Sequence, residues 1–400
     1  MAHTVEGEKK ESKGRAAGPV WKDHNLHVVW FVTLMAVLGS SSVSPAFPEV
    51  RQQFGVSVGQ VGLLITVFTL PGVFLTFFAG ALSDRFGRKR ILVPSLLLFG
   101  SAGGACALAP NFETLLLLRV LQGVGAASLG ALNVTLVGDL FSGRERTTAL
   151  GYNSSVLNVG TASYPAIGGA LAAFGWYYPF ALPLLAIPVA LLVLFSLRNP
   201  EPRNDQELKE KAQSVWERAK NGCVIGLFAN TFVVFVILFG ALIAYLPSFM
   251  SERFGSGSLF IGLVLASTSI TAALASTQAG RLAERFSEKV LIRTSYLLYA
   301  VSLCLVPLVP SVWLLFVPTV LFGVAQTLNL PGAFSLLNEA APDENRGAFI
   351  SLNSTILRLG QTLGPVLMLA ATLPFGLGAA YLLATTLAAA MFLVAFALIR

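Results

Sequence analysis

The chain has 400 residues, of which 55% are hydrophobic and 12% charged, with a formal net charge of +7 and a mean hydropathy of +0.73. A soluble domain carries about 25% charged residues, roughly twice this share. The composition therefore excludes an ordinary soluble domain, and the positive charge is not read as a nucleic-acid-binding signal. Because the apolar residues occur in runs of about 20, the length that crosses a bilayer, we predict an all-α polytopic membrane protein.

Twelve apolar runs predict twelve transmembrane helices. They lie near residues 27–47, 58–79, 91–109, 113–138, 148–172, 176–197, 222–249, 259–280, 290–309, 312–337, 347–372 and 375–398. Residues 1–26 are polar and lack the apolar segment and cleavage site of a signal peptide, so we expect a cytoplasmic tail. Residues 198–221 form a polar linker, either an amphipathic helix on the membrane surface or a solvated tether.

The distribution of Lys and Arg predicts the orientation in the membrane. With the N-terminus inside, 23 of the 27 basic residues fall in segments on that side. Arg51 and Arg253 fall in loops on the opposite side, and Arg119 and Arg358 lie within spans. Because cytoplasmic segments carry an excess of Lys and Arg, we expect both termini in the cytoplasm and the protein in the plasma (inner) membrane.

The two halves of the chain repeat each other at an offset of 200 residues. The matches include Phe54-Gly55 with Phe254-Gly255, Gly62 with Gly262, Gly123 with Gly323, Asn153 with Asn353, and Pro165 with Pro365. One offset holds without gaps from the first span to the eleventh. It predicts two six-helix halves, residues 27–197 and 222–400, arranged as parallel repeats around a central cavity.

The segment GALSDRFGRKR, residues 80–90, places an acid, four bases and two glycines between two apolar runs. Together with the two homologous halves, it resembles the major facilitator superfamily, whose motif G-x-L-x-D-R-x-G-R-[KR] it matches in full. The matching residues are Gly80, Leu82, Asp84, Arg85, Gly87, Arg88 and Lys89, followed by Arg90. The resemblance covers nearly the whole chain after residue 26 and implies a secondary transporter.

The order of charges in this segment predicts a conformational gate on the cytoplasmic side. We expect Asp84 to face the positive N-terminus of the eleventh span and Arg88 to pair with Asp139. An ordinary positive-inside loop would explain the bases alone. The second copy has Glu284, Arg285 and Glu339, but Ser287 and Glu288 replace Gly87 and Arg88, so we expect it to hold more weakly.

Two charged residues are candidates for proton coupling. Arg119 lies within the fourth span, where a guanidinium needs a cavity or a partner. The resemblance marks it, with Gln122 and Gly123, as an Arg associated with proton coupling; a structural Arg bonded to backbone carbonyls is the alternative. Since no Asp or Glu lies deep in a span, Glu49 is the protonation candidate by elimination, and a solvated residue at the outer mouth is its alternative.

The fifth span carries a pattern that resembles the family's antiporter motif, which is associated with exporters. It comprises Gly160, Pro165, Gly168 and Gly169, and Tyr164 stands in place of the motif's central glycine. Close helix packing by small residues is the alternative explanation.

Several polar residues within spans are candidates for a substrate cavity. They are Asn133, Asn158, Gln326, Asn329, Arg358 and Gln361. Each could instead bond neighbouring helices to one another. Arg358 has no charged counterpart in the first half, where Asn158 stands, and it either binds an anionic substrate group or pairs with an acid.

We therefore expect a monomeric, proton-coupled transporter that exports small, partly apolar organic compounds by alternating access, most like the twelve-span drug:proton antiporters. An importer, a uniporter, or a transporter of lipids or organic anions is the alternative. A membrane enzyme or sensor is disfavoured, because no cluster of acids, His or Cys lies at membrane depth and no large soluble domain is present. The sequence has no zinc-ligand spacing and no P-loop, so we expect no metal or other cofactor.

Overall fold

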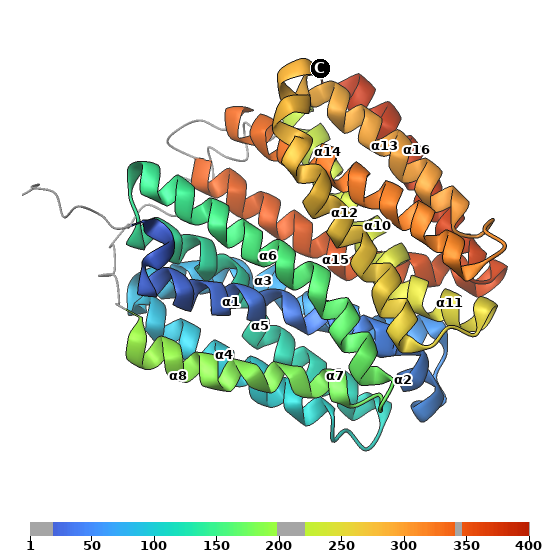
Figure 1. Ribbon diagram of the computed structural model, residues 1–400, viewed down its shortest axis with the longest axis horizontal. Coiled ribbons are helices and arrows are strands. Elements are labelled where there is room, and N and C mark those ends of the chain that lie inside the picture. The colour runs from blue at the N-terminus through green and yellow to red at the C-terminus, as the bar shows by residue number, and fades with distance from the viewer. Residues whose placement is uncertain (1–18, 198–220, 341–345, 400) are drawn as a thin grey trace, which may run out of the picture.

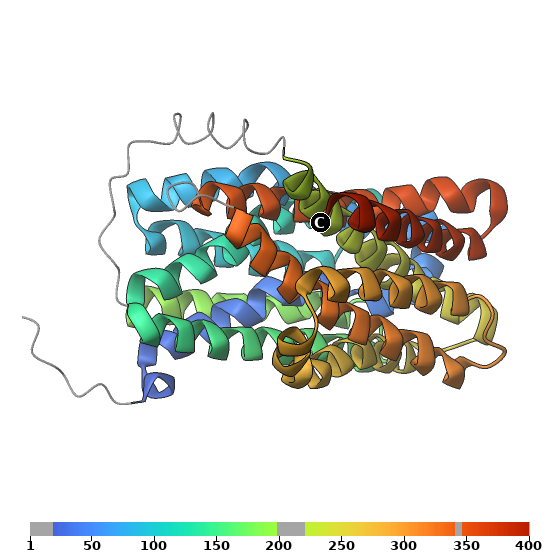
Figure 2. The same ribbon diagram turned by 90° about the horizontal axis from the view of Figure 1, so that it is seen from above.

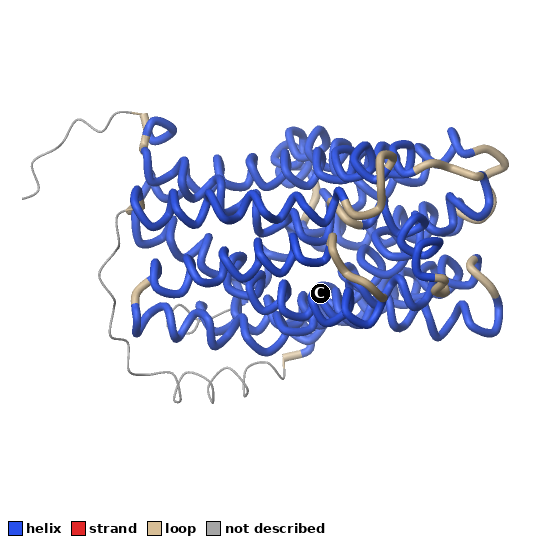
Figure 3. Tube along the Cα trace, turned by 90° about the horizontal axis from the view of Figure 1, so that it is seen from below, coloured by secondary structure: helices blue, strands red, loops and turns tan. Residues whose placement is uncertain are grey.

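The computed structural model describes residues 19–197, 221–340 and 346–399, and the regular elements in these ranges are all helices (Figure 3). Nine helical segments in them are long and apolar enough to cross a membrane. A backbone in lipid must satisfy its hydrogen bonds internally, as these helices do. The chain is therefore an all-helical polytopic membrane protein. The tail up to residue 18 and the linker at 198–220 lie outside the described residues.

The helices between residues 24 and 197 form what we call the N-terminal bundle. They are α1 (His24–Ser41), α2 (Phe47–Phe54), α3 (Val58–Phe86), α4 (Arg88–Cys106), α5 (Phe112–Leu140), α6 (Gly143–Ala172), α7 (Tyr178–Ala181) and α8 (Ala186–Ser196). Short 3-10 turns precede or join them at η1 (Val20–Lys22), η2 (Ser44–Ala46) and η3 (Leu182–Leu185).

The helices between residues 222 and 399 form the C-terminal bundle. They are α10 (Gly222–Ile237), the π-helical η4 (Leu238–Tyr245), α11 (Leu246–Phe254), α12 (Ser258–Arg285), α13 (Glu288–Leu305), η5 (Val312–Leu315), α14 (Phe316–Ala340), α15 (Arg346–Phe375) and α16 (Gly378–Leu398).

Several helices continue past the apolar runs that predict them. We expected the second span to end near residue 79 and the charged segment to be a loop, but α3 runs to Phe86. The chain turns at Gly87, whose φ of +93° favours glycine, and α4 starts at the next residue. Gly80, the first glycine of the charged segment, lies inside α3.

Equivalent contacts recur in the two bundles at the offset of 200 residues. Gly55 and Gly255 end α2 and α11 with the same φ of +64°. A Cβ on Gly123 would lie 2.2 Å from the carbonyl oxygen of Phe68, and one on Gly323 would lie 2.4 Å from that of Thr268. In both bundles a glycine thus lets two helix backbones touch at matched positions.

Matched asparagines also bond the helices of each bundle. The Thr33 hydroxyl donates to Asn153 Oδ1 at 2.5 Å, joining α1 to α6. The Thr231 hydroxyl donates to Asn353 Oδ1 at 2.8 Å, joining α10 to α15. These contacts tie the repeat in the sequence to a repeat in the packing.

The buried apolar residues form separate cores. One core draws only on residues between 224 and 399, and a second only on residues between 26 and 197. A third, smaller core lies mainly in the N-terminal bundle and takes in Phe239 of η4. Figures 1 and 2 show the bundles as two groups of helices that meet near α2 and α11.

Among the residues that the structure describes, the contacts between the two bundles lie toward one end of the helices. We call this the far end, where α2 and α11 finish, and the opposite end, with Arg88 and Arg144, the basic end. Toward the far end, a Cβ on Gly169 or Gly262 would collide with backbone of the other bundle. Toward the basic end, a Cβ on Gly80, Gly151 or Gly280 would meet nothing within 4 Å. The bundles are therefore closed together at the far end and apart at the basic end.

Candidate functional site

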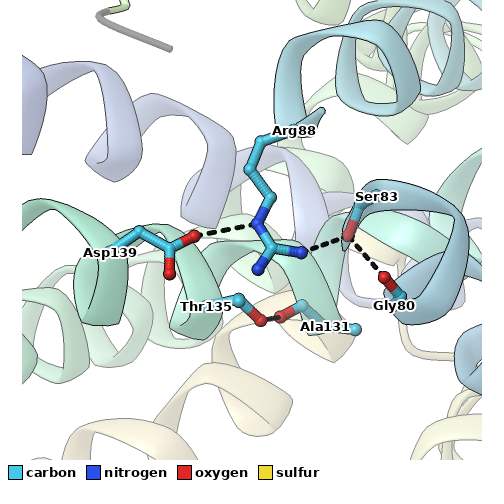
Figure 4. Close-up of polar contacts among 6 residues, drawn as sticks. All are labelled: Gly80, Ser83, Arg88, Ala131, Thr135 and Asp139. Atoms are coloured by element: carbon cyan, nitrogen blue, oxygen red, sulfur yellow. Dashed lines mark hydrogen bonds and ion pairs between the residues drawn. The ribbon is translucent and has the colours of Figure 1, made fainter. Parts of the chain in front are cut away.

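The cluster at the basic end joins α3, α4 and α5 within the N-terminal bundle (Figure 4). Arg88 Nε donates to Asp139 Oδ2 at 2.8 Å, which is the pairing expected from the sequence. Another Arg88 nitrogen donates to the Ser83 hydroxyl, which itself donates to the Gly80 carbonyl at 2.7 Å. Because the Arg88 and Asp139 side chains are only 11% and 21% exposed, the pair fixes how α4 leaves the turn at Gly87.

The other residues predicted to form the gate are either outside the described side chains or exposed. The Asp84 side chain lies outside the described part of the structure, so its predicted contact with the start of α15 stays a prediction. Arg85 is exposed, with its guanidinium 5.4 Å from the centre of the Phe86 ring. In the second copy Glu284, Arg285 and Glu339 are all exposed.

The second copy also lacks an equivalent of the Arg88–Asp139 pair in the residues described. Glu288 occupies the position of Arg88 and packs against Gly332 of α14. Glu339, at the position of Asp139, lies 3.5 Å from the Ser335 hydroxyl of its own helix. The two copies therefore differ in their contacts as well as in their charges, and the weaker hold expected of the second copy stays a prediction.

Arg119 is completely buried and bonded to backbone. Its guanidinium donates to the carbonyls of Gly39 at 2.8 Å and Leu64 at 3.2 Å, and to Gln122 Oε1 at 2.8 Å. It also lies 4.2 Å from the centre of the Phe68 ring. No described carboxylate pairs with it. These contacts favour the structural alternative, in which Arg119 joins α5 to α1 and α3.

The glycines of the antiporter-like pattern on α6 contact two different neighbours. A Cβ on Gly168 would lie 1.8 Å from the Ser42 carbonyl oxygen, inside the N-terminal bundle. A Cβ on Gly169 would lie 2.3 Å from the Ser258 carbonyl oxygen, across the interface. A Cβ on Gly262 would in turn lie 2.2 Å from the Pro165 carbonyl oxygen. The pair Gly168 and Gly169 thus packs α6 against its own bundle and against α12 at once.

The first residues of the same pattern lie deeper in the N-terminal bundle. A Cβ on Gly160 would lie 3.1 Å from side-chain carbons of both Leu34 and Val37 of α1. Tyr164, which replaces the motif's glycine, is 9% exposed and adjoins Gly160. The tyrosine therefore fills space within this bundle, while the contact with α12 begins at the next residue, Pro165.

Polar contacts also cross between the bundles toward the far end. The Thr69 and Thr362 hydroxyls lie 2.9 Å apart, and Thr66 donates to the Thr362 carbonyl at 3.0 Å. The Ser44 hydroxyl donates to the Ile243 carbonyl. In a regular α-helix the Ile243 carbonyl would accept from the N–H of residue 247, but Pro247 has no N–H. Ser44 of the other bundle supplies a donor instead.

A partly exposed ion pair lies at the rim of this contact. Arg51 at the end of α2 pairs with Glu252 of α11. Their side chains are 33% and 40% exposed, so the interaction is weakened by solvent. The sequence analysis did not identify this pair. A signal was present, because Arg51 and Arg253 are the two basic residues assigned to loops opposite the termini, and Glu252 lies next to Arg253.

Glu49 lies at the far end in a crevice between the bundles. The crevice has a volume of about 480 Å³, and its lining includes Glu49, Ala172 of α6, and Ser258 and Leu263 of α12. The Glu49 carboxylate lies beside the hydroxyl and backbone N–H of Ser258, the first residue of α12. An acid from one bundle thus meets the positive N-terminus of a helix in the other. This position differs from a freely solvated mouth residue, which was the alternative.

Arg358 extends from α15 to two helices of the N-terminal bundle. A Cβ on Gly72 of α3 would lie 3.2 Å from its Cδ, and one on Gly130 of α5 would lie 3.0 Å from its Nη2. Within its own helix, Arg358 Nη1 lies 3.4 Å from Gln361 Oε1. Arg358 is half-buried, so part of the side chain stays accessible between the bundles.

Two of the six predicted cavity residues are sealed inside the bundles. Asn133 is 5% exposed, and its amide bonds Thr33 at 2.5 Å and Asn153 at 3.1 Å. Asn329 is fully buried and bonds Asn230 and Ser295. The prediction that these two line a substrate cavity is not supported here, because their hydrogen bonds are taken by neighbouring helices.

The other predicted cavity residues are more accessible or lie at the interface. Asn158 is exposed and Gln326 is half-buried, whereas Gln361 is 8% exposed beside Arg358. Sequence analysis did not identify Gly262 and the Thr69–Thr362 contact as interface residues. The matched Gly62 and Gly262 were a signal for close packing, but a repeat alone does not say which helices touch.

Comparison with known proteins places the chain in a large group of transporters. The family model described as Major Facilitator Superfamily matches residues 29–257 and 227–400. The bacillibactin exporter of Bacillus subtilis is 29% identical over 358 residues, which cover 85% of this chain and 88% of that protein. Multidrug resistance protein 2 of the same organism is 28% identical over 352 residues, with 83% and 85% covered.

A solved structure has the same fold. It is that of a bacterial homolog to the human lysosomal transporter Spinster, in an inward-facing and occupied conformation. The TM-score is 0.75 at 20% sequence identity, and the match covers 96% of this chain and 98% of the other.

Proposed function

The chain belongs to the major facilitator superfamily, and on that premise we propose that it exports small, partly apolar organic compounds in exchange for protons. As a member of this family it is an integral membrane transporter of a small-molecule substrate, not an enzyme. The observation that carries the proposal further is the one-sided contact between the bundles, closed at the far end and apart at the basic end. Such a contact is expected of one state in an alternating-access cycle.

We infer twelve transmembrane spans in two six-helix halves, with boundaries at residues 27–197 and 222–400. Nine segments satisfy the length and hydropathy expected of a span. The remaining three spans are α4, α6 and α13, which are long helices packed alongside the nine. The separate cores and the recurring glycine and asparagine contacts support a division into related halves around a central cavity.

We assign the basic end to the cytoplasm. Arg85, Arg88, Lys89, Arg90 and Arg144 all lie there, and cytoplasmic loops are enriched in such residues. Both termini then lie in the cytoplasm, and the conformation described here is open to the cytoplasm, from which an exporter takes its substrate.

Two observations support export. The named relatives include an exporter and a multidrug resistance protein. In addition, Gly168 and Gly169 pack α6 tightly against both bundles, so this end can close behind a substrate that has left. The protein would act as a monomer, since each chain supplies both halves.

Glu49 is the residue we favour for proton coupling. Its carboxylate lies at the interface that must open and close, beside the N-terminus of α12. Protonation would remove the charge that this helix end attracts and would weaken the closed far end. Arg119 has no such link to the interface, because its hydrogen bonds all lie within the N-terminal bundle.

The test is a transport assay in liposomes that contain a pH-sensitive dye. Lipophilic cations, neutral drugs and organic anions are added to wild-type protein, Glu49→Gln and the control Glu113→Gln, which removes an exposed acid at the start of α5. We expect substrate-dependent proton movement in wild type and control, and its loss in Glu49→Gln. Substrate movement without proton movement in the wild type would contradict antiport.

A further inference from the structure

We propose that Arg358 binds the anionic group of an amphipathic organic substrate in the space between the two bundles. This inference rests on the proposed transport function and names the chemical class of substrate for it. The anionic group would be a carboxylate or another planar or tetrahedral oxyanion, since these match the hydrogen-bonding fork of a guanidinium.

The first observation is the position of the guanidinium. Arg358 belongs to α15 of the C-terminal bundle, yet its side chain lies against Gly72 of α3 and Gly130 of α5 in the N-terminal bundle. Glycine at both positions leaves the room that the side chain occupies, because a Cβ would come within 3.2 Å and 3.0 Å of it. A ligand held by Arg358 would therefore touch both bundles at once.

The second observation is the lack of a counter-charge. No described Asp or Glu forms an ion pair with Arg358, and its hydrogen-bond partner is the neutral Gln361 at 3.4 Å. The helices it touches carry acids only at their ends. Asp84 is 12 residues beyond Gly72, about 18 Å along the helix, and Asp139 is 9 residues beyond Gly130, about 13 Å, and pairs with Arg88.

An unbalanced charge at membrane depth is costly, and a bound anion would offset that cost. Arg119 shows the contrasting case in the same protein. Arg119 is completely buried, and its guanidinium bonds two backbone carbonyls and a glutamine. Arg358 is half-buried and holds a single long hydrogen bond, so its donors remain available to a ligand.

The third observation is access from the basic end. One turn beyond Arg358 toward the far end, Thr362 bonds Thr69 and closes the space between α15 and α3. In the opposite direction Gly80 and Gly151 face open space. Arg358 thus lies where contact between the bundles stops, at the closed end of the space that opens toward the basic end.

Comparison of the two repeats shows that the positive charge of Arg358 is present in only one of them. The position equivalent to Arg358 in the N-terminal bundle holds Asn158, which is neutral and exposed. A positive group between the bundles, among apolar helices, favours a ligand with one anionic group and an apolar body. Lipophilic cations would be disfavoured at this position because they would meet a like charge.

The experiment measures equilibrium binding to the full chain in nanodiscs with two fluorescent ligands, dansylglycine and dansylglycinamide. They share one aromatic body, and only the first carries a carboxylate. We expect wild-type protein to bind the carboxylate about tenfold more tightly than the amide, the factor typical of one charge-assisted hydrogen-bonded pair. Arg358→Gln should abolish this preference by weakening the binding of the carboxylate.

A second variant moves the guanidinium without removing it. Gly130→Ala places a methyl group beside Arg358 Nη2 and should reduce the preference for the carboxylate, whereas Gly151→Ala, with no neighbour within 4 Å, should retain it. Equal binding of the two ligands by the wild type, no binding of either, or a preference that persists in Arg358→Gln would overturn the proposal. Because binding requires no proton gradient, failure of proton antiport in the vesicle assay would leave this result standing.

Discussion

At the scale of single residues, the two arginines within spans have opposite surroundings. Arg119 bonds the carbonyl of Gly39, which lies in the last turn of α1, where carbonyls lack partners within the helix. Its positive charge also suits the negative end of that helix. Arg358, in contrast, lies against two glycines of the other bundle, and among the described residues its guanidinium bonds only the side chain of Gln361. One arginine therefore holds a single bundle together, and the other lies half-buried between the two bundles.

This contrast predicts that Arg119 is required for stability. Arg119→Gln should leave the buried carbonyls of Gly39 and Leu64 without their donor, at about 1–3 kcal/mol for each group. We expect a clearly lower midpoint of thermal unfolding for the purified protein, and no such change for the control Arg90→Gln, which removes an exposed base. A variant that unfolds like the wild type but no longer moves protons would instead assign Arg119 to coupling.

At the scale of helices, the apolar runs predict where spans lie but not where helices end. α3 extends to Phe86 because Ala81, Leu82 and Ser83 continue the helix and only Gly87 adopts a φ that breaks it. The repeat, visible as an offset of 200 residues, predicts paired contacts such as those of Gly123 and Gly323. It does not predict the partner of each polar residue. Asn133 and Asn329 resemble cavity residues in the sequence, and only the packing shows that neighbouring helices satisfy them.

The contact between α6 and α12 leads to a prediction about conformation. In Gly169→Ala the added methyl would lie 2.3 Å from the Ser258 carbonyl oxygen. Because this oxygen belongs to the backbone of α12, the clash is relieved only if the helix itself moves. We expect α6 and α12 to separate, which shifts the population toward a state open at the far end. Spin labels at the exposed positions Gln53 and Leu259, in a background without other cysteines, should report a longer distance.

The matched control for this variant is Gly378→Ala in α16, where a Cβ would meet nothing within 4 Å. It should give the distance distribution of the wild type. If Gly169→Ala also gives the wild-type distribution, the glycine contact does not limit how closely the bundles approach.

At the scale of the whole molecule, the described hydrogen bonds and ion pairs between the bundles all lie toward the far end. They include the contacts of Ser44, Glu49, Arg51, Thr66 and Thr69 with the C-terminal bundle. The Arg88–Asp139 pair at the basic end stays within one bundle. A transporter must open its closed end and break these contacts in every cycle, so each contact has to be weak. Partial exposure of the Arg51–Glu252 pair meets this requirement.

That ion pair gives a prediction for the balance between states. A pair with side chains 33% and 40% exposed contributes at most about 1 kcal/mol, a factor of about five in population. Arg51→Glu and Glu252→Arg should each place like charges opposite one another and reduce the population closed at the far end. The double variant should restore it, because the pair is re-formed in reverse. The same spin-label distance measures the populations, and high salt should shrink the differences.

Arg253→Glu supplies the control for charge reversal itself. Arg253 adjoins Glu252 in the chain, but its guanidinium bonds the Pro307 carbonyl within the C-terminal bundle. Its reversal should leave the populations as they are in the wild type. If the double variant fails to recover the closed state, the attraction between residues 51 and 252 is not what holds the far end closed. Closure would then rest on the uncharged contacts of Gly169, Gly262 and Thr362, which lie deeper in the interface.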